Sequence, residues 1–335
     1  MNLSVGIVGL PNVGKSTLFN ALLKKQQALA ANYPFATIEP NVGIVAVPDE
    51  RLVRLAEITK AEESMSSLPP IKPATVQFVD IAGLVKGASE GAGLGNKFLS
   101  HIREVKIIAH VVRAFEDSNV LRHESSIVDP RPQLPEQSDG GQAKSDYDTV
   151  RTELGLADLE AKGEPLTGKP EIIVLNVAEK DYNTESINKL TEEYSNLLQT
   201  SKDKIIVISA KIEEELAALA ESDQKQYLAD LGLEHSGLER LIQKAYIELG
   251  LISFLTTGAK EARAWTVKKG TNAVEAAGEI HTDFMAKFIK AEVVSYDDFI
   301  SNNGWKGARS TGRARLEGKD YIVQDGDVIE FKIGR

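Results

Sequence analysis

A glycine-rich segment near the start of the chain has the residue types that bind phosphate. Residues 9–16 run Gly-Leu-Pro-Asn-Val-Gly-Lys-Ser and match the pattern G-x-x-x-x-G-K-[ST] in full. Glycines let backbone N–H groups curl around phosphate oxygens, and a following helix adds the positive end of its dipole. We expect the lysine to reach the β- and γ-phosphates and the serine hydroxyl to bind Mg²⁺. The nucleotide contacts predicted here are Asn12, Val13, Gly14, Lys15, Ser16 and Thr17.

Two later segments could complete a site for the metal and the γ-phosphate. Asp80-Ile-Ala-Gly83 follows an apolar run, so Asp80 can hold Mg²⁺ through water and the Gly83 amide can donate to the γ-phosphate. Thr37 lies in a loop and offers a second hydroxyl ligand to the metal. An ordinary turn and a solvated loop threonine are the alternative interpretations.

The residues expected near the base differ from those of a GTPase. Guanine is usually recognised by N-K-x-D, whose aspartate accepts from N1 and N2 of the base, whereas this chain has Asn176-Val177-Ala178-Glu179. Losing the lysine and lengthening the carboxylate should weaken guanine preference. The Asn176 amide has the donor and acceptor to pair with the N6/N7 edge of adenine. Ser209-Ala210-Lys211, after another apolar run, are predicted to close over the base.

The catalytic group is less evident from the sequence. Many GTPases place a water-positioning Gln directly after D-x-x-G, but this chain has Leu84, which cannot orient water. Hydrolysis should therefore be slow unless another group enters the site and orients the water. Residues 83–95 contain five glycines and are expected to be a nucleotide-dependent switch, or a flexible loop with no switching role.

Short apolar runs alternate with helical stretches through the first two-thirds of the chain. Most of these runs are unbroken, which is typical of strands buried on both faces of a parallel sheet. The sequence therefore predicts a doubly wound, mainly parallel α/β domain over residues 1–252. The strands are expected at 3–8, 75–79, 107–112, 171–175 and 205–208, and the helices at 15–24, 96–104, 186–198 and 238–249.

An insertion and a second domain complete the expected organisation. Residues 129–146 hold three prolines and paired glycines and predict a flexible loop, followed by one helix at 147–162, within an insertion at about 124–170. Residues 253–335 predict a small α+β domain, with strands at 264–268 and 291–295 around a helix at 273–288. Asp325-Gly326 predicts a hairpin turn between strands at 320–324 and 328–333.

The amino-acid composition excludes several classes of protein and several kinds of site. The chain has 335 residues, no cysteine and five histidines, which excludes a disulfide framework and a cysteine-based metal site. Its apolar runs are too short for a membrane span, and no signal peptide is evident, so a soluble cytoplasmic protein is expected. A net charge of −10 makes DNA an unexpected partner. We expect a monomer.

Long segments together resemble the Obg-like ATPase family, the YchF subfamily of Obg-related P-loop proteins. They are GIVGLPNVGKSTLFNAL at 6–22, NYPFATIEPN at 32–41, FVDIAGLVKGAS at 78–89, GLGNKFL at 93–99, HVVRAFED at 110–117 and NVAEKD at 176–181. The C-terminal EARAWTVKKGT, HTDF and EGKDYIVQDGDVIEF resemble the family's TGS domain.

The resemblance implies a slow, ATP-preferring hydrolase that associates with the ribosome, with a β-grasp TGS domain. It also implies that a histidine takes the place of the missing Gln, and the matching residue is His123; the sequence alone favours a solvated loop histidine there. Asn12 suggests the potassium dependence known among relatives. Family members carry a long helical hairpin where this chain has a short insertion.

Three hypotheses remain open from the sequence. The first is an ATP-hydrolysing switch with Mg²⁺, in which Lys15 stabilises charge on the transferring phosphoryl group. The second is a GTPase in which Glu179 reaches guanine. The third is a ribosome- or RNA-binding module whose affinity is only tuned by nucleotide. Arg263, Trp265, Lys268, Lys269, Lys287 and Lys290 would supply an RNA-facing surface in that case, or a solvated face with the tryptophan in the core.

Overall fold

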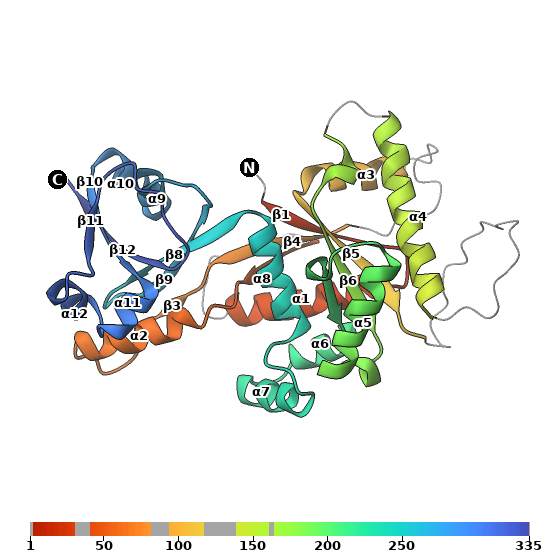
Figure 1. Ribbon diagram of the computed structural model, residues 1–335, viewed down its shortest axis with the longest axis horizontal. Coiled ribbons are helices and arrows are strands. Elements are labelled where there is room, and N and C mark those ends of the chain that lie inside the picture. The colour runs from red at the N-terminus through yellow and green to blue at the C-terminus, as the bar shows by residue number, and fades with distance from the viewer. Residues whose placement is uncertain (1–2, 31–40, 82–93, 117–138, 161–163, 335) are drawn as a thin grey trace, which may run out of the picture. The chain divides into compact units, whose positions relative to one another are not determined.

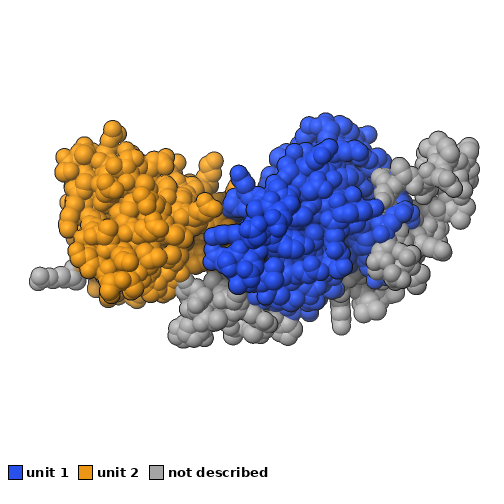
Figure 2. Space-filling model, turned by 90° about the horizontal axis from the view of Figure 1, so that it is seen from below, with its two compact units in different colours: residues 1–45, 76–245 blue, residues 46–75, 246–335 orange. Residues whose placement is uncertain are grey.

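The computed structural model describes residues 3–30, 41–81, 94–116, 139–160 and 164–334. The chain divides into two compact units (Figure 2). Unit 1 holds residues 1–45 and 76–245, and unit 2 holds residues 46–75 and 246–335. None of the helices in these described ranges is long and apolar enough to cross a membrane.

Unit 1 is built on a six-stranded sheet in the order β2-β4-β1-β5-β6-β7 (Figure 1). The pairs β1–β4, β1–β5, β5–β6 and β6–β7 are all parallel, as the unbroken apolar runs predict. The doubly wound fold is therefore confirmed. The strands are β1 Ser4–Val8, β2 Val42–Ala46, β4 Thr75–Asp80, β5 Ile107–Ala114, β6 Glu171–Val177 and β7 Ile205–Ile208.

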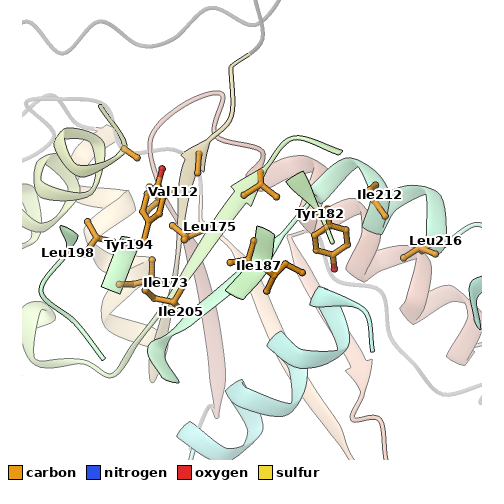
Figure 3. Close-up of a cluster of buried hydrophobic side chains, with 14 of the residues drawn as sticks. Val112, Ile173, Leu175, Tyr182, Ile187, Tyr194, Leu198, Ile205, Ile212 and Leu216 are labelled. Carbon is orange, nitrogen blue, oxygen red and sulfur yellow. The ribbon is translucent and has the colours of Figure 1, made fainter. Parts of the chain in front are cut away.

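Helices and short 3-10 turns connect these strands. The α-helices are α1 Lys15–Ala30, α3 Leu94–Glu104, α4 Asp139–Glu160, α5 Thr184–Leu197, α6 Ala210–Leu216, α7 Glu221–Asp230 and α8 Gly237–Glu248. The 3-10 turns are η2 Leu166–Gly168, η3 Glu179–Asp181 and η4 Lys202–Lys204. A hydrophobic cluster joins α4–α7 to one face of β5, β6 and β7 (Figure 3). Because side chains alternate along a strand, Ile173, Leu175 and Val177 enter this cluster and Asn176 faces the other way.

The insertion differs from its prediction. We expected a loop up to residue 146, but α4 already begins at Asp139. Ala143 is fully buried in the cluster of Figure 3, and Val150, Leu154 and Ala157 continue its buried stripe at helical spacing. Packing along this stripe outweighs the weak helix propensity of the paired glycines, so the loop assignment of residues 139–146 was wrong.

Unit 2 is a second six-stranded sheet, in the order β11-β10-β12-β8-β9-β3. Its strands are β3 Ile71–Lys72, β8 Leu251–Thr257, β9 Ala262–Lys268, β10 Phe288–Ser295, β11 Arg315–Glu317 and β12 Asp327–Ile333. Its helices are α2 Arg51–Glu62, α9 Ala273–Ile280, α10 Thr282–Ala286, α11 Tyr296–Ser301 and α12 Trp305–Ser310. In Figure 1, α9 and α10 lie on one side of this sheet and α2, α11 and α12 on the other.

A segment from early in the chain belongs to unit 2 rather than to the N-terminal domain. Residues 46–75 supply α2, which packs on β8 and β9, and β3, which pairs in parallel with β9. The Glu62 carboxylate accepts from the backbone N–H of Trp305 at 3.2 Å and of Lys306 at 2.7 Å, which caps the start of α12. The boundary expected at 252/253 therefore describes only the C-terminal part of unit 2.

Two local predictions in unit 2 were wrong. The helix expected over 273–288 is interrupted at His281, whose extended backbone and Nδ1, accepting from the Asp283 N–H at 3.1 Å, start a separate helix α10. The hairpin expected around residues 325–326 is absent, since residues 320–324 contribute only one bridge, Asn272 to Ile322. Strand β12 pairs instead with β10 and β8.

Candidate functional site

The glycine-rich segment lies between the carboxyl end of β1 and the start of α1. Gly14 has φ +98°, and a Cβ there would lie 2.2 Å from Asn176 Nδ2, so only glycine allows this approach. No acidic residue occupies the first turn of α1, which leaves the positive end of the helix dipole open to an anion. The loop therefore has the geometry of a phosphate-binding site.

Lys15 is buried at the floor of this loop, with 7% of its surface exposed. Its Nζ donates to the Leu10 carbonyl at 2.6 Å. Burial lowers the pKa of Lys15 to about 8, while the charge of Asp80 acts in the opposite direction. Burial also raises the pKa of Asp80, and Lys15 partly offsets that rise. A cation and a carboxylate are thus held beside the phosphate loop.

Asn176 joins the two loops that flank the site. Its Nδ2 donates to the Val13 carbonyl at 2.9 Å, and its Oδ1 accepts from the Ala210 N–H at 2.9 Å. The side chain is buried, so these bonds have no competition from water. The pairing of this amide with the N6/N7 edge of adenine stays a sequence-based prediction, since the amide oxygen has a second lone pair and the amide nitrogen a second hydrogen.

A cleft of about 740 Å³ opens over these residues. Its lining joins most of the predicted contacts with residues that the sequence did not single out. The lining residues are Asn12, Gly14, Lys15, Ser16, Thr17, Phe115, Glu116, Asn176, Val177, Ala178, Glu179, Ser209, Ala210, Lys211 and Glu214. Thr37, Gly83, Leu84 and His123 lie outside the described residues.

The end of the cleft expected to receive the base carries an ion pair. The Lys211 ammonium contacts the Glu179 carboxylate, and both side chains are largely exposed. Val177 is buried in the hydrophobic cluster, so it offers no long stem to lie over a base. The carboxylate in the place of the GTPase aspartate is thus already engaged by a cation.

Phe115 is a lining residue that sequence reasoning missed. It directly follows β5, half-buried, with the Arg113 guanidinium 4.5 Å from its ring centre and Arg113 Nε donating to its carbonyl at 3.1 Å. Ligands of open α/β sheets bind at the carboxyl ends of strands, and this rule could have singled out Phe115 and Glu116. The fold and the site together define a P-loop nucleotide-binding protein.

Comparisons with known proteins agree with this class. Residues 4–135 match the model of the 50S ribosome-binding GTPases, and residues 251–334 match the YchF GTPase C-terminal model, described as a protein of unknown function, DUF933. The ribosome-binding ATPase YchF of Bacillus subtilis is 42% identical over 99% of both chains. Its counterpart from Mycoplasma genitalium is 43% identical over 98% of this chain and 99% of that protein.

A solved structure agrees over the same extent. The Schizosaccharomyces pombe YchF GTPase has a TM-score of 0.74 and 33% identity, covering 99% of this chain and 98% of that one. The chain belongs to the YchF family. Its alignment to the Bacillus subtilis protein spans 385 positions against 335 residues here, so at least 50 aligned positions have no residue in this chain. An insertion that is shorter in this chain than in the relative would leave such positions without a residue.

Proposed function

We propose that this chain binds ATP and slowly hydrolyses it to ADP and phosphate, as a nucleotide-dependent switch associated with the ribosome. The observation that carries the proposal is the cleft in which Lys15, the glycine-rich loop, Asn176 and residues 209–211 converge. Relatives that are named ribosome-binding ATPases match over nearly the whole chain, which supports both the reaction and the partner.

Magnesium would be held by side chains that suit it. The Ser16 hydroxyl lines the cleft beside Lys15, and Asp80 ends the neighbouring strand β4. Hydroxyl and carboxylate oxygens are ligands that Mg²⁺ prefers, and it keeps several waters and phosphate oxygens besides. The bound ion would neutralise charge that develops on the phosphate oxygens. Thr37 as a second ligand, Asn12 in a potassium site, the Gly83 amide at the γ-phosphate and His123 as the water-orienting group remain sequence-based predictions.

Lys15 has the main electrostatic role in this scheme. Its ammonium donates to the Leu10 carbonyl. A triphosphate offers a stronger, charged acceptor, so the Lys15 ammonium would move from the carbonyl to the β- and γ-phosphates. Purified Lys15→Ala protein should lose ATP hydrolysis, and turnover at the normal rate would overturn the proposal. A Lys24→Ala variant, changed on the same helix, controls for loss of positive charge and should keep its activity.

Preference for ATP over GTP follows from the state of Glu179. A guanine would need this carboxylate to accept from N1 and N2, and it would have to displace Lys211 to reach it. Because exposed ion pairs are worth about 0.2–1 kcal/mol, Lys211→Ala should raise GTP affinity relative to ATP by up to about fivefold. Glu179→Ala should change ATP affinity little. A large loss of nucleotide preference in Glu179→Ala would favour a GTPase, the term used for the fission yeast structure.

The ribosome as partner is tested separately. Ribosomes are sedimented with the protein in ATP, in ADP and without nucleotide. A switch predicts that the bound fraction depends on the nucleotide. Equal binding in all three conditions would contradict the switch and favour a binding module whose turnover is incidental.

A further inference from the structure

A buried pair of side chains lies behind the end of the cleft that is expected to receive the base. Two segments of the chain meet at that end. The first follows β6 and carries Glu179 in η3, and the second follows β7 and carries Lys211 at the start of α6. Tyr182 comes directly after η3, and Glu213 lies in the first turn of α6. Both side chains are almost fully buried, and neither is among the described residues that line the cleft.

A short hydrogen bond joins the members of this pair. Tyr182 Oη donates to Glu213 Oε1 at 2.6 Å. The backbone N–H of Gly237, at the start of α8, donates to the same Glu213 oxygen at 2.7 Å and to Tyr182 Oη at 2.6 Å. Burial raises the pKa of Tyr182 well above its usual value, and the charge of Glu213 adds to that rise, so the hydroxyl keeps its proton. A hydrogen bond to a carboxylate is roughly twice as strong as one between neutral groups.

Backbone hydrogen bonds connect each buried side chain to the segment in front of it. The Tyr182 N–H donates to the Glu179 carbonyl at 3.1 Å, and the Glu213 N–H donates to the Ser209 carbonyl at 2.9 Å. Tyr182 also shares the hydrophobic cluster of Figure 3 with apolar side chains of α6. A shift of η3 relative to α6 would therefore break a buried hydrogen bond and disturb apolar packing at the same time.

The contact between the same two segments on the cleft side is weaker. The side chains of Lys211 and Glu179, which form the ion pair, are 67% and 48% exposed. Exposed ion pairs contribute little, because water screens both charges and two long side chains lose rotamer freedom. The chain is instead held by buried bonds on both sides of η3, from Asn176 before it and from Tyr182 after it. These bonds fix where Glu179 lies.

We propose that Tyr182 and Glu213 are positioning residues for base selection, whose buried bond keeps Glu179 beside Lys211 and away from a guanine. The inference rests on the proposed function, in which the engaged Glu179 gives the preference for ATP. Without the Tyr182 hydroxyl, η3 could shift relative to α6, and Glu179 would more readily accept from N1 and N2 of guanine. The pair thus acts on nucleotide choice through Glu179, without touching the nucleotide.

The readout is the ratio of ATP affinity to GTP affinity, measured by calorimetry on the full chain with Mg²⁺. Tyr182→Phe keeps the ring, removes the hydroxyl and should lower this ratio by up to about fivefold, the limit expected for Lys211→Ala. In a Lys211→Ala background the same change should lower the ratio far less, because Glu179 is already released there. A merely structural role would weaken the binding of both nucleotides alike and leave the ratio unchanged.

A matched control comes from the same hydrophobic cluster. Tyr194→Phe also removes a hydroxyl from a buried tyrosine, but at the other end of the cluster in Figure 3, and should keep the wild-type ratio. An equal fall of the ratio in Tyr194→Phe and Tyr182→Phe would overturn the inference.

Two variants of Glu213 keep the test decisive if Tyr182→Phe does not fold. Glu213→Gln retains an oxygen that can accept from the Tyr182 hydroxyl and the Gly237 N–H, so the ratio should stay near that of the wild type. Glu213→Asp withdraws the carboxylate by one methylene and should lower the ratio as Tyr182→Phe does. If the wild type prefers ATP and either Tyr182→Phe or Glu213→Asp leaves the ratio unchanged, this inference alone is overturned. Equal affinities of the wild type for ATP and GTP would overturn the proposed preference and the inference with it.

Discussion

The link that Asn176 makes between two loops gives a quantitative prediction. In nucleotide-free protein, Asn176→Ala removes both the donor to the Val13 carbonyl and the acceptor for the Ala210 N–H. Each partner is then left unsatisfied near a side chain that was 5% exposed. An unsatisfied buried group costs about 1–3 kcal/mol, so the free energy of unfolding of unit 1 should fall by about 2–6 kcal/mol.

Asn176→Asp separates the two bonds. The carboxylate still accepts from Ala210 but cannot donate to Val13, and it places a charge in a buried site. At neutral pH it should therefore destabilise unit 1 at least as much as the alanine does. Both variants should also bind ATP at least about tenfold more weakly, because the bonds that hold the phosphate loop and residues 209–211 together are lost.

Hydrogen exchange read by mass spectrometry is the suitable assay. Both tryptophans lie in unit 2, so fluorescence would not report on unit 1 directly. Exchange should accelerate in β1 and β6 and stay unchanged in β8 and β9. Asn196→Ala, at an exposed position of α5, is the control and should change little. If Asn176→Ala lowers the free energy of unfolding of unit 1 by less than about 1 kcal/mol, or if Asn196→Ala lowers it equally, the reasoning is refuted.

Three further outcomes follow from the same geometry. Burial lowers the pKa of Lys15 from 10.5 to about 8, so between these pH values the unfolded chain binds a proton that the folded chain does not. The free energy of unfolding of the nucleotide-free wild type, compared with that of Lys15→Met, should therefore rise by up to about 3 kcal/mol as the pH rises through this window. Parallel urea titrations at pH 7.5 and 10 measure this difference, and no such rise would contradict the prediction. Gly237→Ala should lower the free energy of unfolding in urea titrations by about 1–3 kcal/mol, since its Cβ would lie 2.7 Å from both Tyr182 Oη and Ile208 Cγ1. Gly258→Ala, whose Cβ would have nothing within 4 Å, should lower it far less, and equal losses would show that packing is not the cause. Gly14→Ala should abolish ATP binding in calorimetry, because its Cβ would collide with the Asn176 amide at a positive φ, and normal affinity would show that the loop can relax.

The phosphate loop and the parallel sheet could be predicted because their signals are local. The segment at residues 9–16 is contiguous, β7 is an unbroken apolar run, and β5 is mostly apolar and buried from Ile107 to Ala114. In contrast, the role of Asn176 depends on the alternation of β6 and on two loops brought together by folding, 163 and 34 residues away along the chain. The bonds of Asn176 to Val13 and Ala210 could therefore not be foreseen from the sequence.

Unit 2 shows the same limit at a larger scale. That residues 46–75 join the C-terminal sheet is set by the packing of α2 on β8 and β9, about 200 residues away along the chain. Asp325 and Gly326 do form a turn, but the Asp325 side chain bonds to residues outside the expected hairpin. Its carboxylate accepts from the Ser253 N–H at 2.9 Å and pairs with Arg51 at 2.8 Å. A turn motif predicts a change of direction and not the partner of the next strand.

The most direct test of the proposed nucleotide specificity is a parallel calorimetric titration of nucleotide-free protein with ATP and GTP, in Mg²⁺ and K⁺. The engaged Glu179 and the buried Val177 predict that ATP binds at least about tenfold more tightly, a difference of roughly 1.4 kcal/mol. Equal affinities, or tighter binding of GTP, would contradict the assignment of the base site and make the protein a GTPase.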